Sequence, residues 1–213
     1  MTGSKTSAMF VTLEGGEGAG KSTSRDFIVS LLEEYNVPFI QTREPGGTPI
    51  GEALRELLLS RNGTAPAVTT ELLMVFAARA QHLHEVIEPA LHAGKWVLCD
   101  RFTDATYAYQ GHGRGFDLGE IEALEALVQR GRHPDLTLLF DIDPQLGMAR
   151  ARQRGELDRF EQEELSFFER VREGYLSRAE FDSRFKIIDA SRSIDDVQDA
   201  LREVLKPFLD GAS

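Results

Sequence analysis

A glycine-rich segment near the start of the chain has the composition of a phosphate-binding loop. It reads Gly15-Gly16-Glu17-Gly18-Ala19-Gly20-Lys21-Ser22 and fits the pattern G-x-x-x-x-G-K-[ST]. Glycines let backbone N–H groups turn toward a phosphate, and the N-terminus of a following helix adds partial positive charge. In such a loop Lys21 reaches the β- and γ-phosphates of a nucleoside triphosphate, and the Ser22 hydroxyl serves Mg²⁺. Because the pattern stands between an expected strand and an expected helix, it predicts a nucleoside triphosphate site rather than a purely structural glycine loop.

Glu17 is unusual because it places a carboxylate inside a loop that binds anions. One interpretation is that its side chain points to solvent. The other is that it faces a second substrate and accepts hydrogen bonds from a hydroxyl group of that molecule.

Charged residues follow two segments that read as buried strands. Arg43 follows the second expected strand, and Asp100 and Arg101 follow the third. Either arginine alone is typical of an ordinary surface charge, but both at strand ends beside a phosphate loop favour a site for an acceptor phosphate. A strand-terminal aspartate commonly serves Mg²⁺ in such sheets, so we assign that role to Asp100. An ion pair with an arginine is the alternative, and Asp141 and Asp143 compete for the metal role.

A second group of arginines surrounds Gly155, where a glycine and several charges interrupt two helical stretches. This arrangement resembles a mobile lid, which we place at residues 150–161. A solvated helix end is the alternative interpretation. The group consists of Arg150, Arg152, Arg154 and Arg159.

The elements that must position these residues alternate along the chain. Short apolar runs predict buried strands, and apolar residues at helical spacing predict helices between them. This alternation predicts an α/β fold with a five-stranded parallel sheet and helices on both faces. Together with the phosphate loop and the short helical lid, the expected fold is the P-loop NTPase fold. The expected strands are residues 9–13, 37–40, 96–99, 136–140 and 185–188. The expected helices are residues 22–35, 50–59, 69–92, 103–110, 119–130, 144–153, 160–180 and 194–209.

Length and composition limit the remaining possibilities. The 213 residues predict a single domain over residues 9–213, preceded by a flexible tail at residues 1–8. A net charge of −11 argues against nucleic-acid binding, which needs a basic face. The short polar start of the sequence has no apolar region, so we expect no secretory signal, and no apolar run is long enough for a membrane helix. A single cysteine, Cys99, predicts a reducing compartment, so we expect a cytoplasmic protein without membrane partners.

Three classes of phosphate-loop protein can be compared with these residues. A GTPase would carry an Asn/Thr-Lys-x-Asp motif for its base, which the sequence lacks, and a large ATPase motor would be longer. A small-molecule kinase needs arginines facing the loop, as found here. The chemistry alone leaves open which nucleotide or nucleoside such a kinase phosphorylates. A regulatory protein that binds ATP without transferring its phosphoryl group is the alternative from another class.

Six segments together resemble the bacterial thymidylate kinase family over nearly the whole chain. The T-R-E-P-G-G-T segment at residues 42–48 and the D-R-F segment at residues 100–102 are the most specific. The resemblance implies conversion of dTMP to dTDP by a homodimer, with ATP as phosphoryl donor and Mg²⁺ as cofactor. The other four segments are residues 10–15 with the phosphate loop, 76–82, 108–111 and 154–161.

The resemblance also implies roles for residues on the dTMP side. Arg43 and Arg101 would hold the dTMP phosphate, and Glu17 would accept from the 3′-hydroxyl of the sugar. Spacing alone places Phe76 in the core, on the apolar side of helix 69–92 with Leu72, Leu73, Val75, Leu83 and Val86. The resemblance implies instead that its ring stacks on thymine. The remaining implied contacts are Arg79 with thymine O4, Thr106 and Gln110 with the base edge, Tyr109 with sugar C2′, and Phe160 near the nucleotide.

On the donor side the resemblance implies that Arg154 clamps the transferred phosphoryl group from the lid. The ATP site would comprise residues 15–22 together with Thr23, and Ala190, Ser191 and Arg192 would line the adenine. Phe102 departs from a family position that varies between an aromatic residue and histidine, so its contact is not specified. With Lys21, Arg101 and Asp100, Arg154 completes the expected catalytic set.

Overall fold

The computed structural model describes residues 8–60, 65–153 and 159–211. Five strands form one sheet in the order β2-β3-β1-β4-β5, and every neighbouring pair is parallel. The predicted α/β fold with a five-stranded parallel sheet is therefore confirmed. The strands are β1 (Phe10–Glu14), β2 (Phe39–Arg43), β3 (Trp96–Asp100), β4 (Leu136–Asp141) and β5 (Phe185–Asp189).

Each strand runs one to three residues beyond its expected end. The expected strands stopped at the last apolar residue, whereas the backbone ladder continues to a charged residue in every case. These five charged strand ends lie at the same edge of the sheet, since all strands are parallel. They are Glu14, Arg43, Asp100, Asp141 and Asp189.

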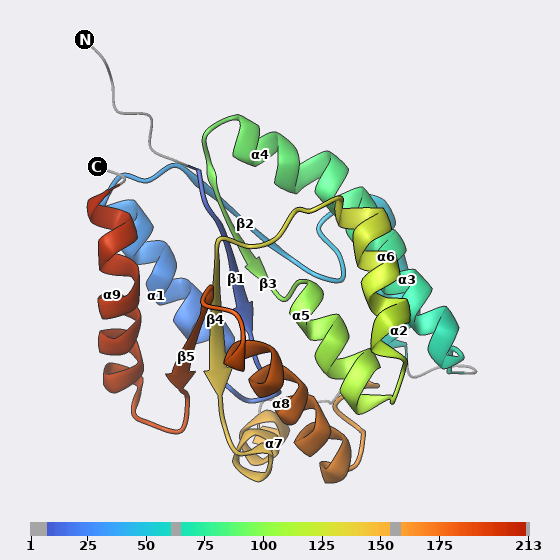
Figure 1. The fold of residues 1–213 in the computed structure, drawn as a ribbon. Coiled ribbons are helices and arrows are strands. Elements are labelled where there is room, and N and C mark those ends of the chain that lie inside the picture. The colour runs from blue at the N-terminus through green and yellow to red at the C-terminus, as the bar shows by residue number, and fades with distance from the viewer. Residues whose placement is uncertain (1–7, 61–64, 154–158, 212–213) are drawn as a thin grey trace.

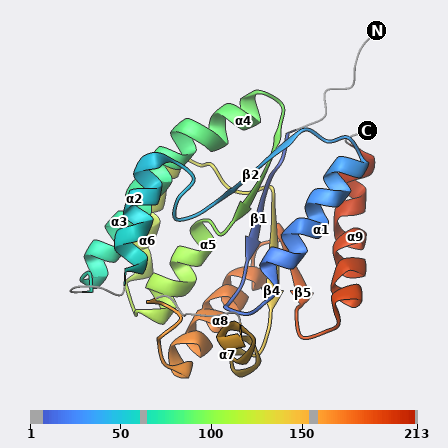
Figure 2. The ribbon, with the colours of Figure 1, turned by 180° about the vertical axis from the view of Figure 1, so that it is seen from behind.

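Two helices cover one face of the sheet. In Figures 1 and 2, α1 (Lys21–Glu34) and α9 (Ile194–Asp210) lie side by side along the strands. Their buried residues, such as Leu31 and Leu201, pack with alternate residues of the central strands, such as Leu13 and Leu138. This packing builds the largest apolar core and fixes the start of α1 at the carboxyl edge of the sheet.

The opposite face carries the remaining helices in two layers. The inner helical segments are η1 (Leu83–Ile87), α4 (Glu88–His92), η2 (Tyr107–Gly113) and α8 (Leu165–Glu180). They pack on strand residues such as Val97 and Leu139. The other helices of this half are α2 (Pro49–Leu59), α3 (Val68–His82), α5 (Thr103–Thr106) and α6 (Leu118–Gln129), and α7 (Pro144–Gln153) lies below β4 in Figure 1.

Three expected helices need correction. The expected helix 69–92 is α3, a π-helical turn and α4 in succession, and Leu73 on its predicted apolar side is 51% exposed. The expected helix 103–110 likewise passes from α5 into the π-helical η2. The expected helix 160–180 begins only at Leu165, because residues 159–163 form a turn that ion pairs from Arg159 and Glu163 attach to other elements.

Two predicted segments include residues outside the described part. Of the expected tail 1–8 only Ala8 is described, and of the expected lid 150–161 residues 154–158 are not. Residues 150–153 form the last turn of α7. Within the described ranges, no helix is long and apolar enough to cross a membrane. Cys99 is fully buried in β3, as predicted.

Candidate active site

A cavity of about 780 Å³ opens at the carboxyl edge of the sheet. Its walls come from residues 17–24 of the loop and α1, from the ends of β2 and β3, from α2, α3, α5 and η2, and from the start of α9. Parallel α/β sheets bind ligands in this place, and the volume falls within the range of ligand sites. The cavity brings together most of the residues that the sequence singled out.

The phosphate loop forms one wall of the cavity. Gly18 and Gly20 have φ values of 70° and 75°, and Gly20 is the N-cap of α1. A side chain on Gly18 would collide with the carbonyl oxygen of Gly147 in α7, so the loop needs glycine there. Residues 17–23 line the cavity directly, whereas Gly15 and Gly16 lie behind them. The helix start therefore points its unpaired N–H groups at the cavity.

Lys21 is held against its own loop. Its Nζ donates to the carbonyl oxygens of Gly15 and Gly16 over 2.9 and 3.0 Å. Burial lowers the pKa of Lys21, and the nearby Arg101 guanidinium lowers it further. A phosphate placed in the cavity would compensate this desolvated charge, which is the arrangement expected of an anion site.

Asp100 is the carboxylate best placed for a metal. Its Oδ1 is buried without a hydrogen-bond partner, and it lines the cavity together with Ser22. The two competing aspartates are occupied: Asp141 accepts two hydrogen bonds from Arg172, and Asp143 caps the start of α7. One free carboxylate oxygen and one hydroxyl suit Mg²⁺, which keeps several waters and is bound by few protein groups.

Arg101 links the strand edge to the phosphate loop. Its Nη1 donates to the Gly15 carbonyl oxygen over 3.0 Å and to the Tyr175 hydroxyl over 3.1 Å. Its Nη2 donates to Oε1 of Glu17 over 2.6 Å. The backbone of Arg101 has a φ of 67°, a left-handed conformation that is costly for an arginine. Such strain at a cavity wall is typical of a functional position.

Glu17 faces the cavity rather than bulk solvent. Besides Arg101, the Tyr109 hydroxyl donates to its Oε1 over 2.8 Å, and its side chain is largely covered. The structure therefore excludes the solvent-facing interpretation of Glu17 and agrees with the interpretation that it faces a second substrate.

Glu14 is a buried residue beside the site that the sequence analysis did not single out. It is fully buried at the end of β1, where Oε1 accepts from the Phe102 N–H over 2.7 Å and Oε2 from the Tyr175 hydroxyl over 2.8 Å. Burial, followed by the charge of Asp104, raises the pKa of Glu14 to about 7. The available signal was a carboxylate directly before the glycines at the end of an apolar strand.

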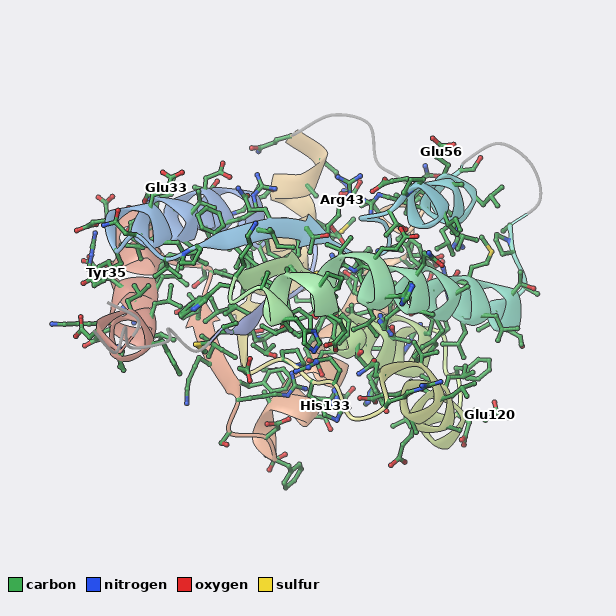
Figure 3. All side chains as sticks on the ribbon, turned by 90° about the horizontal axis from the view of Figure 1, so that it is seen from above. Glu33, Tyr35, Arg43, Glu56, Glu120 and His133 are labelled. Carbon is green, nitrogen blue, oxygen red and sulfur yellow. The ribbon has the colours of Figure 1, made fainter. Side chains whose placement is uncertain are left out.

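Arg43 reaches the same cavity from the neighbouring strand. Figure 3 shows it where β2 ends, beside α2. Its Nη2 donates to Oε2 of Glu52 over 2.7 Å, and the pair is half-exposed. The Gly47 N–H also donates to Glu52 and, with Arg43, holds the pKa of that carboxyl below its usual value. Arg43 and Arg101 thus line one cavity from adjacent strand ends, as predicted.

Arg79 presents an unused donor at the far end of the cavity. Its Nε donates to Glu44 over 2.7 Å and its Nη2 to the Thr106 hydroxyl over 2.9 Å, while Nη1 is buried with no partner. Arg79, Thr106 and Gln110 all line the cavity. The predicted base-edge residues are therefore together, and they include a hydrogen-bond donor left for a ligand.

The position of Phe76 agrees with the core placement that its spacing predicts and corrects the stacking role that the resemblance implies. Its side chain is 2% exposed, packs with Leu72, Tyr107 and Ile121, and does not line the cavity. Val75 lines the cavity instead. Residues four apart on a helix lie on the same face, so Val75 is the residue that shares the cavity face with Arg79. The Phe76 ring supports Arg79, whose guanidinium carbon lies 4.9 Å from the ring centroid.

Three other aromatic residues shape the same end. Tyr109 lies edge-on to Phe160 with ring centroids 6.0 Å apart, and both line the cavity. Phe102, whose contact the sequence left unspecified, is buried beside the Arg79 guanidinium at 5.0 Å and also reaches the cavity wall.

The segment before α9 forms the wall beyond the phosphate loop. Ala190 and Arg192 line the cavity, whereas Ser191 does not, because its hydroxyl and N–H donate to Asp189. These bonds hold the pKa of Asp189 below its usual value. Arg150 also lines the cavity and donates to the Ala190 carbonyl oxygen over 2.8 Å. The sequence analysis placed Arg150 only in the lid.

The arginines of the expected lid differ in their contacts. Arg159 donates to the Leu58 carbonyl oxygen over 2.7 Å and to Glu71 over 2.6 Å, so it is attached to α2 and α3. Arg154, the predicted clamp, lies outside the described residues.

Fold and site define a P-loop phosphotransferase of the nucleotide kinase class. The thymidylate kinase family matches residues 13–201. The thymidylate kinase of Pseudomonas putida (strain GB-1) is 57% identical over 193 residues, covering 90% of this chain and 92% of that protein. The thymidylate kinases of Pseudomonas syringae pv. tomato and Hahella chejuensis are each 55% identical, covering 95% of this chain and 97% and 98% of theirs. The chain belongs to the thymidylate kinase family.

Proposed function

We propose that the chain transfers the γ-phosphoryl group of ATP to the 5′-phosphate of dTMP, giving ADP and dTDP. The observation that carries this function is that one cavity contains residues suited to both substrates. It has a phosphate loop at one end, two strand-end arginines beside it, and the unpaired Arg79 Nη1 at the other. Membership of the thymidylate kinase family identifies the enzyme class and its acceptor.

The transfer forms one bond and breaks one bond. A phosphate oxygen of dTMP bonds to the γ-phosphorus, and the bond from that phosphorus to the oxygen shared with the β-phosphate breaks. The acceptor oxygen is already ionised near neutral pH, so the reaction needs no general base. Alignment and charge neutralisation carry the catalysis.

On the donor side, residues 15–23 hold the phosphates of ATP through their N–H groups, and Lys21 neutralises the β- and γ-phosphates. To do so, the Lys21 ammonium exchanges its two loop carbonyls for phosphate oxygens. The adenine lies against Ala190 and Arg192, with Ser191 acting through the turn that it forms with Asp189. Arg150 holds that segment and belongs to the donor site.

Magnesium is proposed as the cofactor, with Asp100 and Ser22 as the residues that hold it. The free Asp100 Oδ1 supports this assignment. When bound, Mg²⁺ neutralises charge on the phosphates of ATP. Asp100→Asn should raise the Mg²⁺ concentration needed for half-maximal activity, and an unchanged requirement would remove Asp100 from the metal site.

On the acceptor side, Arg43 and Arg101 hold the phosphate of dTMP in line with the γ-phosphate. Glu17 accepts from the 3′-hydroxyl, and Tyr109 crowds the sugar at C2′. Arg79 donates to thymine O4, while Thr106 and Gln110 contact the base edge and Val75 with Phe160 borders the ring. Guanidinium forks match phosphate oxygens well, which supports the two arginines in this role.

Arg154 keeps its predicted role as the arginine that stabilises the transferred phosphoryl group. This proposal rests on the sequence resemblance at residues 154–161. Arg159 is already engaged by Glu71 and Leu58, which favours Arg154 over its neighbour.

A single kinase domain, a cytoplasmic location and a homodimer complete the proposal. The dimer is supported by apolar side chains on the outer helices: Leu73 on α3 is 51% and Leu127 on α6 is 69% exposed. Ala80, two turns after Leu73, and Leu127 border the same groove. Leu127→Arg should yield monomers in sedimentation experiments, and an unchanged mass would place the interface elsewhere.

A substrate panel tests the proposed function. ADP release should be measured with dTMP, dUMP, dCMP and thymidine, and dTMP should give the highest kcat/KM. Preference for another acceptor would indicate a kinase of the same fold with a different substrate. Binding of ATP without acceptor-dependent ADP release would indicate a regulatory protein.

A further inference from the structure

Gln110 in η2 is held by a buried carboxylate from another helix. Gln110 is 3% exposed and Glu71 of α3 is 1% exposed, and the Gln110 Nε2 donates to Oε1 of Glu71 over 2.8 Å. Gln110 lines the cavity, whereas Glu71 does not. Glu71 therefore acts on the cavity only through the amide that it holds.

The carboxylate determines which atom of the amide faces the ligand. A carboxylate only accepts hydrogen bonds, so the amide must turn its nitrogen toward Glu71. The Gln110 Oε1 remains, and no described residue donates to it. At this wall, Gln110 therefore presents a hydrogen-bond acceptor.

A donor stands close to this acceptor. Arg79 is bonded to Thr106, which precedes Gln110 by about one helical turn, and its Nη1 has no partner among the described groups. A donor beside an acceptor complements a ring edge with a carbonyl next to an N–H, as in thymine and uracil. Cytosine carries an amino group and an unprotonated ring nitrogen at the same positions, so it would face both groups with the wrong polarity.

Glu71 is itself fixed by two arginines. Arg159 Nη2 donates to its Oε2 over 2.6 Å, and Arg114 Nε lies 3.5 Å from its Oε1. These partners hold the carboxylate in place between α3, η2 and the turn before α8. Rotation of the Gln110 amide would direct its oxygen at a carboxylate oxygen, which is repulsive.

We propose that Glu71 is a positioning residue for base selectivity: it locks the Gln110 amide so that the cavity accepts an imide edge and rejects an aminopyrimidine edge. The proposal rests on the base placement proposed above. It concerns a residue that touches no substrate, and it predicts a change in selectivity rather than only a loss of activity.

The test compares two substrates that differ only at this edge. dTMP and 5-methyl-dCMP share the sugar, the phosphate and the C5 methyl group. In Glu71→Gln, the side chain at position 71 can donate or accept, so the Gln110 amide can rotate. The ratio of kcat/KM for dTMP to that for 5-methyl-dCMP should fall by about tenfold or more, since a buried polar mismatch no longer penalises the wrong base.

Two further variants make this result specific. Glu125→Gln is the matched control, because Glu125 is also buried and accepts from a glutamine amide, Gln129, away from the cavity. For Glu125→Gln, the ratio of kcat/KM for dTMP to that for 5-methyl-dCMP should stay within about threefold of the parent value. Glu71→Asp keeps the charge for Arg159 and Arg114 but retracts from Gln110, so its ratio should be intermediate. This variant carries the test if Glu71→Gln fails to fold.

Gln110→Ala separates the inference from the base placement on which it depends. If Gln110→Ala lowers the ratio and both Glu71 variants leave it unchanged, Glu71 has no positioning role and the inference is overturned. If Gln110→Ala also leaves the ratio unchanged, the base placement fails with it. Equal falls in Glu71→Gln and Glu125→Gln would reduce the effect to general destabilisation and would likewise overturn the inference.

Discussion

Arg101 at the end of β3 donates from Nη2 to Oε1 of Glu17 in the phosphate loop over 2.6 Å. The contact joins the residue proposed for the acceptor phosphate to the residue proposed for the sugar hydroxyl. An incoming nucleotide offers a phosphate to Arg101 and a hydroxyl donor to Glu17, so it can replace the pair without leaving either charge unpaired. The Arg101–Glu17 pair is thus internally compensated, and substrate binding exchanges one compensated pairing for another.

Glu17→Gln should weaken dTMP more than its 3′-deoxy analogue. Both substrates offer Arg101 the same phosphate in exchange for its bond to Glu17, so that effect is equal for the two, and only dTMP also loses a charge-assisted bond from its 3′-hydroxyl. That bond is worth about 1.5–3 kcal/mol, so the KM for dTMP should rise roughly ten- to a hundredfold more than that of the analogue. Equal losses, measured in parallel assays, would remove the hydroxyl from the role of Glu17.

Lys21→Ala should abolish transfer while leaving the fold intact. The Lys21 Nζ contacts only two carbonyl oxygens of its own loop in the described structure, so its removal costs little stability. Thermal unfolding should therefore occur within a few degrees of the parent. Lys95→Ala is the control, since Lys95 is exposed at the opposite end of β3 and should retain full activity. Normal turnover by Lys21→Ala would refute the assignment of the ATP site.

Phe76→Ala should mainly lower stability, whereas Val75→Ala should mainly raise the KM for dTMP. Phe76 is a core residue, and its truncation should cost about 3–5 kcal/mol, which corresponds to roughly 10 °C in a chain of this size. Val75 faces the cavity, so its truncation should raise the KM for dTMP with a smaller loss of stability. The reverse pattern in unfolding and steady-state experiments would return Phe76 to the base site.

Glu14 should make stability depend on pH near neutrality. Its pKa is raised from 4.5 to about 7 in the folded chain, so the folded state binds the proton more tightly than the unfolded state. The stability from the protonated carboxyl is complete below about pH 4.5 and is lost as the pH rises through 7, by up to about 3 kcal/mol. The amide in Glu14→Gln does not titrate, so this variant is the reference.

Denaturant unfolding of both proteins between pH 5 and pH 8 measures this effect. The stability of the parent relative to Glu14→Gln should decrease as the pH rises. A relative stability that rises with pH would mean that the carboxyl is stabilised as an anion by Arg101 and Tyr175.

The order of elements was predictable because parallel strands buried on both faces leave apolar runs and the phosphate loop has a strict spacing. The extra residues at the strand ends were not, since charged residues such as Asp100 end an apolar run while the backbone ladder continues through them. The long helix was found, but the π-helical turn at Leu83–Ile87 has no signature in apolar spacing.

The sequence could predict the site residues that are proposed to contact a ligand directly. Lys21, Arg43 and Arg101 stood out because they combine a phosphate-loop lysine with two arginines at strand ends, whereas Arg79, inside a helix, was found only through the resemblance. Glu14 and Glu71 did not stand out, because they act through buried hydrogen bonds to partners distant in the sequence. The error at Phe76 arose because the resemblance was preferred to the apolar spacing, which had placed Phe76 in the core.

Following the γ-phosphoryl group itself tests the central claim most directly. ATP labelled in its γ-phosphate should be incubated with dTMP, and the products separated and identified. The account predicts that the label moves into dTDP, one for each ADP formed, in the parent protein and not in Lys21→Ala. Label released as inorganic phosphate at the same rate with or without dTMP would contradict it.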